Sequence, residues 1–148
     1  MNAFTLEIKL HTEIPLSQFM QVKVIHADEK QIELRCPLAP NHNHVGTAFG
    51  GSLATMMVLA AYCQLFKIID ETGHVLLKTS SMKYMHPVEE TLRAICNAPT
   101  DDQLQKFKDA FTKKGKGRLT LTSQILLADG RTACEMTGEF VGIGSTSE

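Results

Sequence analysis

Residues 52–69 read SLATMMVLAAYCQLFKII, and this stretch decides the fold. Its apolar residues are spread over nearly every side of a helix, which indicates a helix enclosed by protein. The apolar stretch Leu53–Phe66 covers only 14 residues, fewer than the roughly 20 that a membrane-spanning helix needs. The sequence therefore predicts one long buried helix and no membrane span.

The segments around this helix have the pattern of β-strands. Residues 22–27 and 31–36 alternate apolar and polar side chains across the polar turn 28–30, which is typical of a hairpin with one covered face. After the helix, Gly73 suits a left-handed stop, and Asp129-Gly130 is a hairpin turn signal. Four further strands are predicted, at residues 74–84, 91–97, 118–127 and 132–141.

Three segments are less clear in the sequence. Residues 2–11 place apolar side chains at alternate positions, so a strand and a short helix compete there. Residues 14–17 predict the start of a single helical turn, with Pro15 at an early position. Residues 101–114 are polar, and they form either a surface helix or a long loop.

Together the segments predict a short helix, two strands, the long helix and four strands. One apolar helix needs a sheet curved around it, so the expected class is α+β, an antiparallel sheet wrapped around one long buried helix. The length of 148 residues suits a single domain over residues 1–148.

Composition excludes several classes of protein. With 43% hydrophobic residues and a net charge of −1, the chain is not disordered, and its balanced charge gives no reason to expect nucleic-acid binding. The four cysteines lack C-x-x-C or metal spacing, which favours reduced thiols in a cytoplasmic protein. The first residues, MNAFTLEIKLHTE, do not form a secretory signal. We expect no metal and no cofactor, since the H-x-H of His42 and His44 supplies only two ligands.

A second motif lies just before the long helix. Residues 40–53 read PNHNHVGTAFGGSL, and they resemble hotdog-fold thioesterases, above all the thioesterase-like domain that follows an N-acetyltransferase domain in some bacterial proteins. HTEIPLS at residues 11–17 and YMHPV at residues 84–88 extend the resemblance over most of residues 6–142. It implies a hotdog fold, hydrolysis of an acyl-CoA or acyl-carrier-protein thioester, and homodimers or homotetramers with sites between one subunit's helix and the other's loop.

The related phenylacetyl-CoA-thioesterase-like proteins carry the pattern N-x-x-G-x-x-H-G-G-x6-D. Here Asn43, Gly46, Gly50 and Gly51 match that pattern, but Phe49 replaces its histidine and Val58 replaces its acid. In that group the acid activates water or attacks the thioester. Because residues 45–66 offer no substitute for it, hydrolysis here needs another base or a water held by neutral donors.

The two glycines predict a site for a carbonyl oxygen. The first N–H groups of a helix lack intrahelical acceptors, and Gly50 and Gly51 let a ligand approach them closely. Such groups polarise a thioester carbonyl and stabilise its oxyanion. Alternatively, the glycines only permit tight packing between helix and sheet.

Asn43 and His44 are the polar catalytic candidates beside Gly51. The Asn43 amide can accept from a water and donate to a carbonyl, or it can simply shape the loop. His44 can act as a general base, since imidazoles serve this role most often, although an exposed loop histidine is often inert.

Six further side chains or backbone groups are expected to bind substrate. Thr55, one turn beyond Gly51, bonds either a ligand or its own helix, and one of Ser80 and Ser81 faces the helix because neighbours on a strand alternate. Residues 101–118 carry a net charge of +3, which suits coenzyme A phosphates or an acidic carrier protein but also an ordinary solvated face. The expected substrate-binding residues are Thr47, Phe49, Gly50, Thr55, Ser81 and Tyr84.

The sequence therefore predicts an acyl thioesterase in which Gly50 and Gly51 polarise the carbonyl and Asn43 orients water. A hotdog module that binds acyl thioesters without catalysis is the alternative, and the apolar Val58 favours it. A hotdog dehydratase is a weaker alternative, because it needs a carboxylate on the helix.

Overall fold

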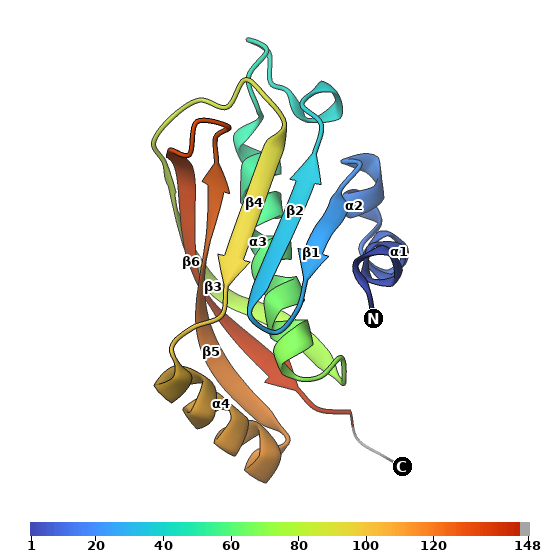
Figure 1. Ribbon diagram of the computed structural model, residues 1–148, viewed down its shortest axis with the longest axis vertical. Helices are drawn as coiled ribbons and strands as arrows, with labels where there is room; N and C mark the ends of the chain where they lie inside the picture. Colours follow the sequence, from blue (N-terminus) through green and yellow to red (C-terminus); the bar gives the residue numbers. More distant parts are fainter. Residues whose placement is uncertain (146–148) are drawn as a thin grey trace.

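The computed structural model describes residues 1–145, which form four α-helices, one short 3₁₀ helix and six β-strands (Figure 1). The domain predicted over residues 1–148 thus ends outside the described residues. In chain order the elements are α1 (Ala3–Glu13), α2 (Pro15–Phe19), β1 (Lys23–Ala27), β2 (Gln31–Cys36), η1 (Ala39–Asn41), α3 (Gly50–Ile68), β3 (His74–Tyr84), β4 (Leu92–Asn97), α4 (Asp101–Lys114), β5 (Lys116–Leu126) and β6 (Thr132–Ile143).

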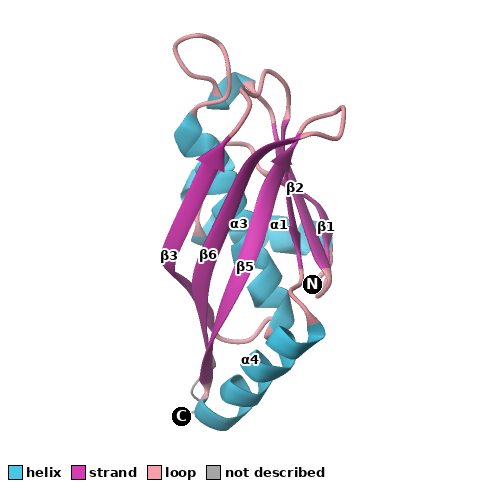
Figure 2. Ribbon diagram, turned by 90° about the vertical axis from the view of Figure 1, so that its left-hand side faces the viewer, coloured by secondary structure: helices cyan, strands magenta, loops and turns pink. Residues whose placement is uncertain are grey.

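The six strands form one antiparallel sheet in the order β1-β2-β4-β5-β6-β3. β5 and β6 pair along nearly their whole length, from Lys116 opposite Ile143 to Leu126 opposite Thr132. The sheet curves around α3, with β1 and β3 at its two edges (Figures 1 and 2). The predicted hotdog architecture, an antiparallel sheet wrapped around one long helix, is confirmed.

Helix α3 is the centre of the hydrophobic core. Ten of its 19 residues are buried, so the helix is a core element although its length and composition would also suit a membrane span. The Ser123 hydroxyl of β5 donates to the Met57 carbonyl oxygen at 2.8 Å, which ties the helix to the sheet. The buried residues are Leu53, Met56, Met57, Leu59, Ala60, Ala61, Cys63, Gln64, Leu65 and Phe66.

One face of α3 departs from the prediction of complete enclosure. Ala54, Thr55, Val58 and Tyr62, which follow one another at helical spacing, are only half-buried. The reason is that the two edges of the curved sheet do not meet around the helix. The composition of the helix could not reveal this opening, because the open face is as apolar as the buried ones.

The sequence left the structure of residues 2–11 and 101–114 open, and both segments form helices. In α1, the Asn2 side chain caps the first turn by accepting the Thr5 amide hydrogen at 2.8 Å, and Leu6 and Leu10 are buried one turn apart. In α4, Thr100 and Gln103 form a capping box. Phe107 is the buried side chain of α4, and its ring packs against Gly117 of β5 and Gly142 of β6.

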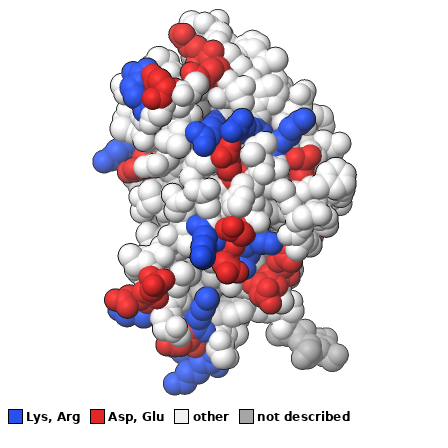
Figure 3. Space-filling model, viewed as in Figure 1, with Lys and Arg blue, Asp and Glu red and all other residues white. Residues whose placement is uncertain are grey.

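Charged side chains of both signs are interspersed with wide uncharged areas on the face drawn in Figure 3. The most buried of the carboxylates is Glu33 of β2, which is 8% exposed. Burial raises its pKa, but hydrogen bonds and charge from Arg93 and Arg35 outweigh this effect, so its pKa lies below the ordinary value. Glu33 is therefore a charged member of the β2–β4 pairing at neutral pH.

Candidate active site at the start of α3

The first amides of α3 have no acceptor within the described residues. Helix α3 starts at Gly50 after the N-cap residue Phe49, which provides no side-chain cap. The intrahelical ladder begins at Leu53, whose N–H donates to the Phe49 carbonyl oxygen at 3.0 Å. For Gly50, Gly51 and Ser52, residues 1–145 supply no hydrogen-bond acceptor. These N–H groups are available to a ligand at the positive end of the helix dipole.

A buried asparagine holds the loop that leads into these amides. The carbonyl oxygen of Asn41 accepts the Phe49 amide hydrogen at 2.7 Å. Its side chain, 2% exposed, donates to the carbonyl oxygens of Met20 at 3.0 Å and Pro37 at 2.8 Å. Asn41 therefore connects the start of α3 to the end of α2 and to the segment after β2.

Asn43 shapes the loop itself. Its side-chain oxygen accepts the amide hydrogens of Val45 at 3.0 Å and Thr47 at 3.1 Å, and its NH₂ group donates to the Thr47 hydroxyl at 2.8 Å. Gly46 completes the turn with a φ of 87°, a conformation that glycine adopts at little cost. The loop-shaping role that the sequence offered for Asn43 is thus present. Its second amide hydrogen is still free among residues 1–145.

The two histidines of the loop differ in their surroundings. The His42 ring contacts the Asn43 carbonyl oxygen through Nδ1 at 2.8 Å. His44 is exposed and makes no hydrogen bond to the described residues, so it projects from the loop beside Asn43. Within residues 1–145 no group of three or more His, Cys, Asp or Glu side chains could hold a metal ion.

The two glycines have different surroundings. A Cβ atom on Gly51 would collide with the Phe49 ring, whose Cδ2 atom would lie 3.0 Å away, whereas a Cβ on Gly50 would meet nothing within 4 Å. The Phe49 ring therefore lies over Gly51, although 56% of this side chain remains exposed. Tight packing against the sheet does not explain either glycine.

An apolar groove runs along the open face of α3, starting one turn after Gly51. It has a volume of about 290 Å³ and is lined on α3 by Ala54, Thr55, Val58, Leu59 and Tyr62, with Ile14 between α1 and α2 forming the other wall. Val58, which stands where related proteins carry an acid, is part of this apolar lining. The groove suits an acyl chain and provides no base.

The remaining predicted residues are not all near α3. The Thr55 hydroxyl donates to the Gly51 carbonyl oxygen at 2.8 Å, so it bonds its own helix. Ser81 pairs with Thr137, which lies on the outer face of the sheet, whereas Met82 pairs with the fully buried Met136. Ser80 and not Ser81 therefore shares the face of the sheet that covers α3.

Tyr84 lies at the end of β3, on the same face of the sheet as Met82. Its side chain is 52% exposed, and its hydroxyl donates to the Met82 sulfur at 3.3 Å.

The site that the structure assembles thus consists of the loop residues Asn43 and Thr47, the Phe49–Gly51 helix start and the groove beyond it. Sequence analysis missed Asn41, because a single asparagine beside a proline carries no signal of burial.

Several solved structures share the overall fold of this chain. A 28% identical Chlorobaculum tepidum protein of unknown function has a TM-score of 0.86, and the match covers 97% of this chain and 98% of that one. A Shewanella oneidensis protein described as a putative thioesterase is 24% identical, with a TM-score of 0.83 and coverage of 95% and 96%. The Escherichia coli PaaI protein of the phenylacetic acid degradation operon is 15% identical, with a TM-score of 0.73 and coverage of 97% and 95%.

A search of the curated proteins finds no match to the chain. Residues 3–143 match the family described as "Putative thioesterase (yiiD_Cterm)", which is the family that the motif at residues 40–53 suggested. Since this match covers nearly the whole sequence and the fold is that of solved hotdog proteins, the chain belongs to this thioesterase family.

Proposed function

We propose that the protein hydrolyses an acyl-CoA or acyl-carrier-protein thioester at the start of α3. The observation that carries the proposal is the free N–H of Gly51 next to an apolar groove of about 290 Å³. A thioester places a polar carbonyl beside an apolar acyl chain. The Gly51 N–H matches the carbonyl, and the apolar groove matches the acyl chain. Removing one such donor typically costs 10²- to 10³-fold in kcat.

In the proposed reaction, the thioester carbonyl oxygen accepts hydrogen bonds from the N–H groups of Gly51 and Gly50. A water oxygen attacks the carbonyl carbon, and the negative charge that develops on the carbonyl oxygen is stabilised by these donors and the helix dipole. The C–S bond then breaks, and the thiolate leaves and takes up a proton. The acyl chain lies along Val58 and Tyr62 in the groove.

Asn43 orients the attacking water, and His44 of the facing subunit accepts its proton. Both lone pairs of the Asn43 oxygen are used by Val45 and Thr47, so Asn43 can hold the water only by donating its free amide hydrogen. It cannot take the proton, and α3 carries no carboxylate between Gly50 and Ile68. The imidazole of His44 can accept a proton and return it, so it serves as the base in this proposal.

We propose that two copies assemble into a homodimer, or a dimer of dimers, that completes the site. Among residues 1–145, strand β3 pairs only with β6, and its other edge is open. Its exposed side chains include Leu76 at 57% and Leu77 at 41%, and an open apolar edge strand is a ready surface for pairing. A second copy also covers the open face of α3.

The further substrate contacts in this proposal come from Thr47, Phe49, Thr55 and Tyr84. The Thr55 hydroxyl donates a hydrogen bond to the Gly51 carbonyl oxygen, and its oxygen can still accept one from a ligand. Ser81 contacts substrate only if the substrate crosses the outer face of the sheet. Reduced, buried thiols support a cytoplasmic location, and the proposed reaction needs no cofactor and no metal.

The test is hydrolysis of acyl-CoAs of increasing chain length and of acyl-carrier protein, with release of free thiol as the readout. Asn43→Asp keeps an oxygen that accepts from the Val45 and Thr47 amides, and its second oxygen can accept from the Thr47 hydroxyl, so the loop retains acceptors while the amide donor is lost. We expect turnover by the natural protein, a loss of about tenfold or more in Asn43→Asp, and a comparable loss in His44→Ala. No turnover with any substrate overturns the proposal.

A module that binds acyl thioesters without hydrolysing them is the second candidate. The apolar lining at Val58 favours it, because the group that serves as base or nucleophile in related proteins is absent there. Saturable binding of acyl-CoA together with complete absence of turnover would select this candidate over the enzyme.

A further inference from the structure

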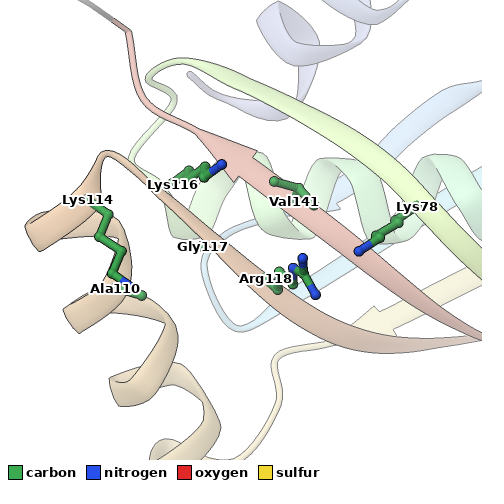
Figure 4. Close-up of a pocket in the computed structure, with 7 residues that line it drawn as sticks. All are labelled: Lys78, Ala110, Lys114, Lys116, Gly117, Arg118 and Val141. Atoms are coloured by element: carbon green, nitrogen blue, oxygen red, sulfur yellow. The ribbon is translucent and has the colours of Figure 1, made fainter.

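A second, basic groove lies at the opposite end of the molecule from Gly51. It has a volume of about 500 Å³ and lies between α4 and the outer face of β5, β6 and β3 (Figure 4). Its four basic side chains come from three elements: Lys78 from β3, Lys116 and Arg118 from β5, and Lys114 from the last turn of α4. Figure 4 shows Lys78 and Arg118 reaching over β6 toward each other.

One carboxylate faces these four positive charges. Glu139 of β6 lies between Lys78 and Arg118, at 3.8 Å and 3.7 Å from their nitrogens. Both separations exceed hydrogen-bond length, and the Glu139 Oε1 atom has no hydrogen-bond partner. Lys114 and Lys116 make no ion pair with residues 1–145. The groove therefore holds a surplus of positive charge that the described chain leaves uncompensated.

We infer that this groove binds the phosphorylated nucleotide end of coenzyme A. The inference rests on the proposed function, and it specifies acyl-CoA as the substrate class. The diphosphate and the 3′-phosphate of CoA bring several negative charges to one small region, and lysine and arginine side chains recognise such groups by charge-assisted hydrogen bonds.

The shape of the groove favours a small anion over a protein partner. A volume of about 500 Å³ lies in the range of small-molecule sites, roughly 300–1,000 Å³. Between its cations the floor is formed by Val141, Gly117 and Ala110, which gives an apolar surface for an adenine ring. Arg118 is 69% exposed in its side chain, so its guanidinium is free to stack on that ring.

The proposed dimer brings this groove toward a thioester site. The start of α3 and helix α4 lie at opposite ends of one chain (Figure 1). Antiparallel pairing of two β3 edges reverses the second copy, so the start of its α3 points toward the α4 end of the first copy. In this arrangement the groove of one copy faces toward the helix start of the other copy.

The experiment is a calorimetric binding titration of the full chain with CoA, dephospho-CoA and pantetheine. We expect CoA to bind most tightly, dephospho-CoA more weakly because it lacks the 3′-phosphate, and pantetheine most weakly because it has no nucleotide. The double variant Lys116→Gln/Arg118→Gln should raise the Kd for CoA by about tenfold or more, since it loses two charged contacts. The same change should leave the Kd for pantetheine unaltered.

Two neighbouring lysines provide a matched control. Lys113 and Lys114 are both exposed and both lie in the last turn of α4, but only Lys114 lines the groove. Lys114→Gln should weaken CoA binding about threefold to tenfold, while Lys113→Gln should leave it unchanged. Equal weakening by both substitutions would indicate a general field effect, and it would overturn the inference.

The outcomes separate this inference from the proposed hydrolysis. Groove-dependent CoA binding without turnover supports the groove and rejects the hydrolysis. Turnover of acyl-CoA that is unaffected in KM by Lys116→Gln/Arg118→Gln supports the hydrolysis and overturns the groove. A loss restricted to acyl-carrier-protein substrates, with unchanged CoA affinity, also overturns the inference, because a carrier protein is then the partner.

Discussion

The carbonyl oxygen of Asn41 accepts the amide hydrogen of Phe49 at 2.7 Å, and this bond fixes the point at which α3 begins. The Asn41 side chain is itself held by the carbonyl oxygens of Met20 and Pro37. Asn41 thus connects the start of α3 to the end of α2 and to the segment after β2, although it does not line the apolar groove.

Replacing Asn41 by alanine should destabilise the protein. The substitution leaves two carbonyl oxygens without their donor, so we expect the free energy of unfolding to fall by about 2–4 kcal/mol, measured by urea denaturation. Asn97→Ala is the control, because this exposed side chain only accepts from Gln31 and its loss should change stability by less than about 0.5 kcal/mol. Equal stability of the two variants would contradict the role of Asn41.

The surroundings of the two glycines predict unequal effects on catalysis. A methyl group on Gly51 displaces the Phe49 ring and narrows access to the amide, so Gly51→Ala should lower kcat/KM for acyl-CoA by about 10²-fold. A methyl group on Gly50 displaces no protein atom, so Gly50→Ala should lower kcat/KM less than Gly51→Ala does. The added substitution Phe49→Ala should restore part of the loss in Gly51→Ala. Identical kinetics of the two glycine variants would rule out this steric argument.

Filling the apolar groove should change the preference for acyl length. Val58→Phe adds bulk to a groove of about 290 Å³, so we expect kcat/KM for long acyl chains to fall about tenfold more than that for acetyl-CoA. Ile25→Phe serves as the control, because it also replaces a β-branched aliphatic side chain by phenylalanine but lies on β1, outside the groove. A uniform loss with every chain length would show that the acyl chain lies elsewhere.

The thiols should make the stability of the fold depend on pH in alkaline solution. Burial raises the pKa of Cys36, Cys63 and Cys96 to about 12 and that of Cys134 to about 11. An unfolded thiol titrates near 9, so the folded state holds its proton more tightly. This contribution to stability is complete below pH 9 and is lost as the pH rises toward 12.

Two measurements test the effect of the thiols. Urea denaturation between pH 8 and pH 11 should show a falling free energy of unfolding, with a smaller slope in Cys63→Ala because that variant lacks one titrating thiol. In addition, no cysteine of the folded protein should react with a thiol reagent at about pH 8, whereas all should react in urea. Rapid labelling of the folded protein would contradict the burial of these groups.

Most of the fold could be predicted from the sequence, because hydrophobic periodicity fixes which residues face the core. The strands at residues 31–36 and 74–84 have the predicted bounds, and the other four differ by one or two residues at their ends. Helix α1 was ambiguous, because Leu6 and Leu10 satisfy a helix while Phe4 and Ile8, both exposed, complete an apparent strand alternation. Only the packing of α1 on the rest of the protein decides between the two.

The site could be predicted less well than the fold. The glycine motif correctly located the free amides, because every helix start leaves such groups unpaired. The contribution of Asn41 and the open face of α3 depend on contacts between segments far apart in the sequence, such as Asn41 with Met20. A helix that is apolar on all sides gives no indication of which side the sheet leaves uncovered.

The unpaired edge of β3 has a consequence for how the protein is made and handled. A newly synthesised chain that has folded still exposes a row of backbone donors and acceptors beside Leu76 and Leu77, and any extended polypeptide can bind there. Productive assembly and aggregation therefore compete for the same strand. Slow expression at low temperature should favour productive assembly. Leu77→Lys should yield a protein that remains monomeric even at high concentration.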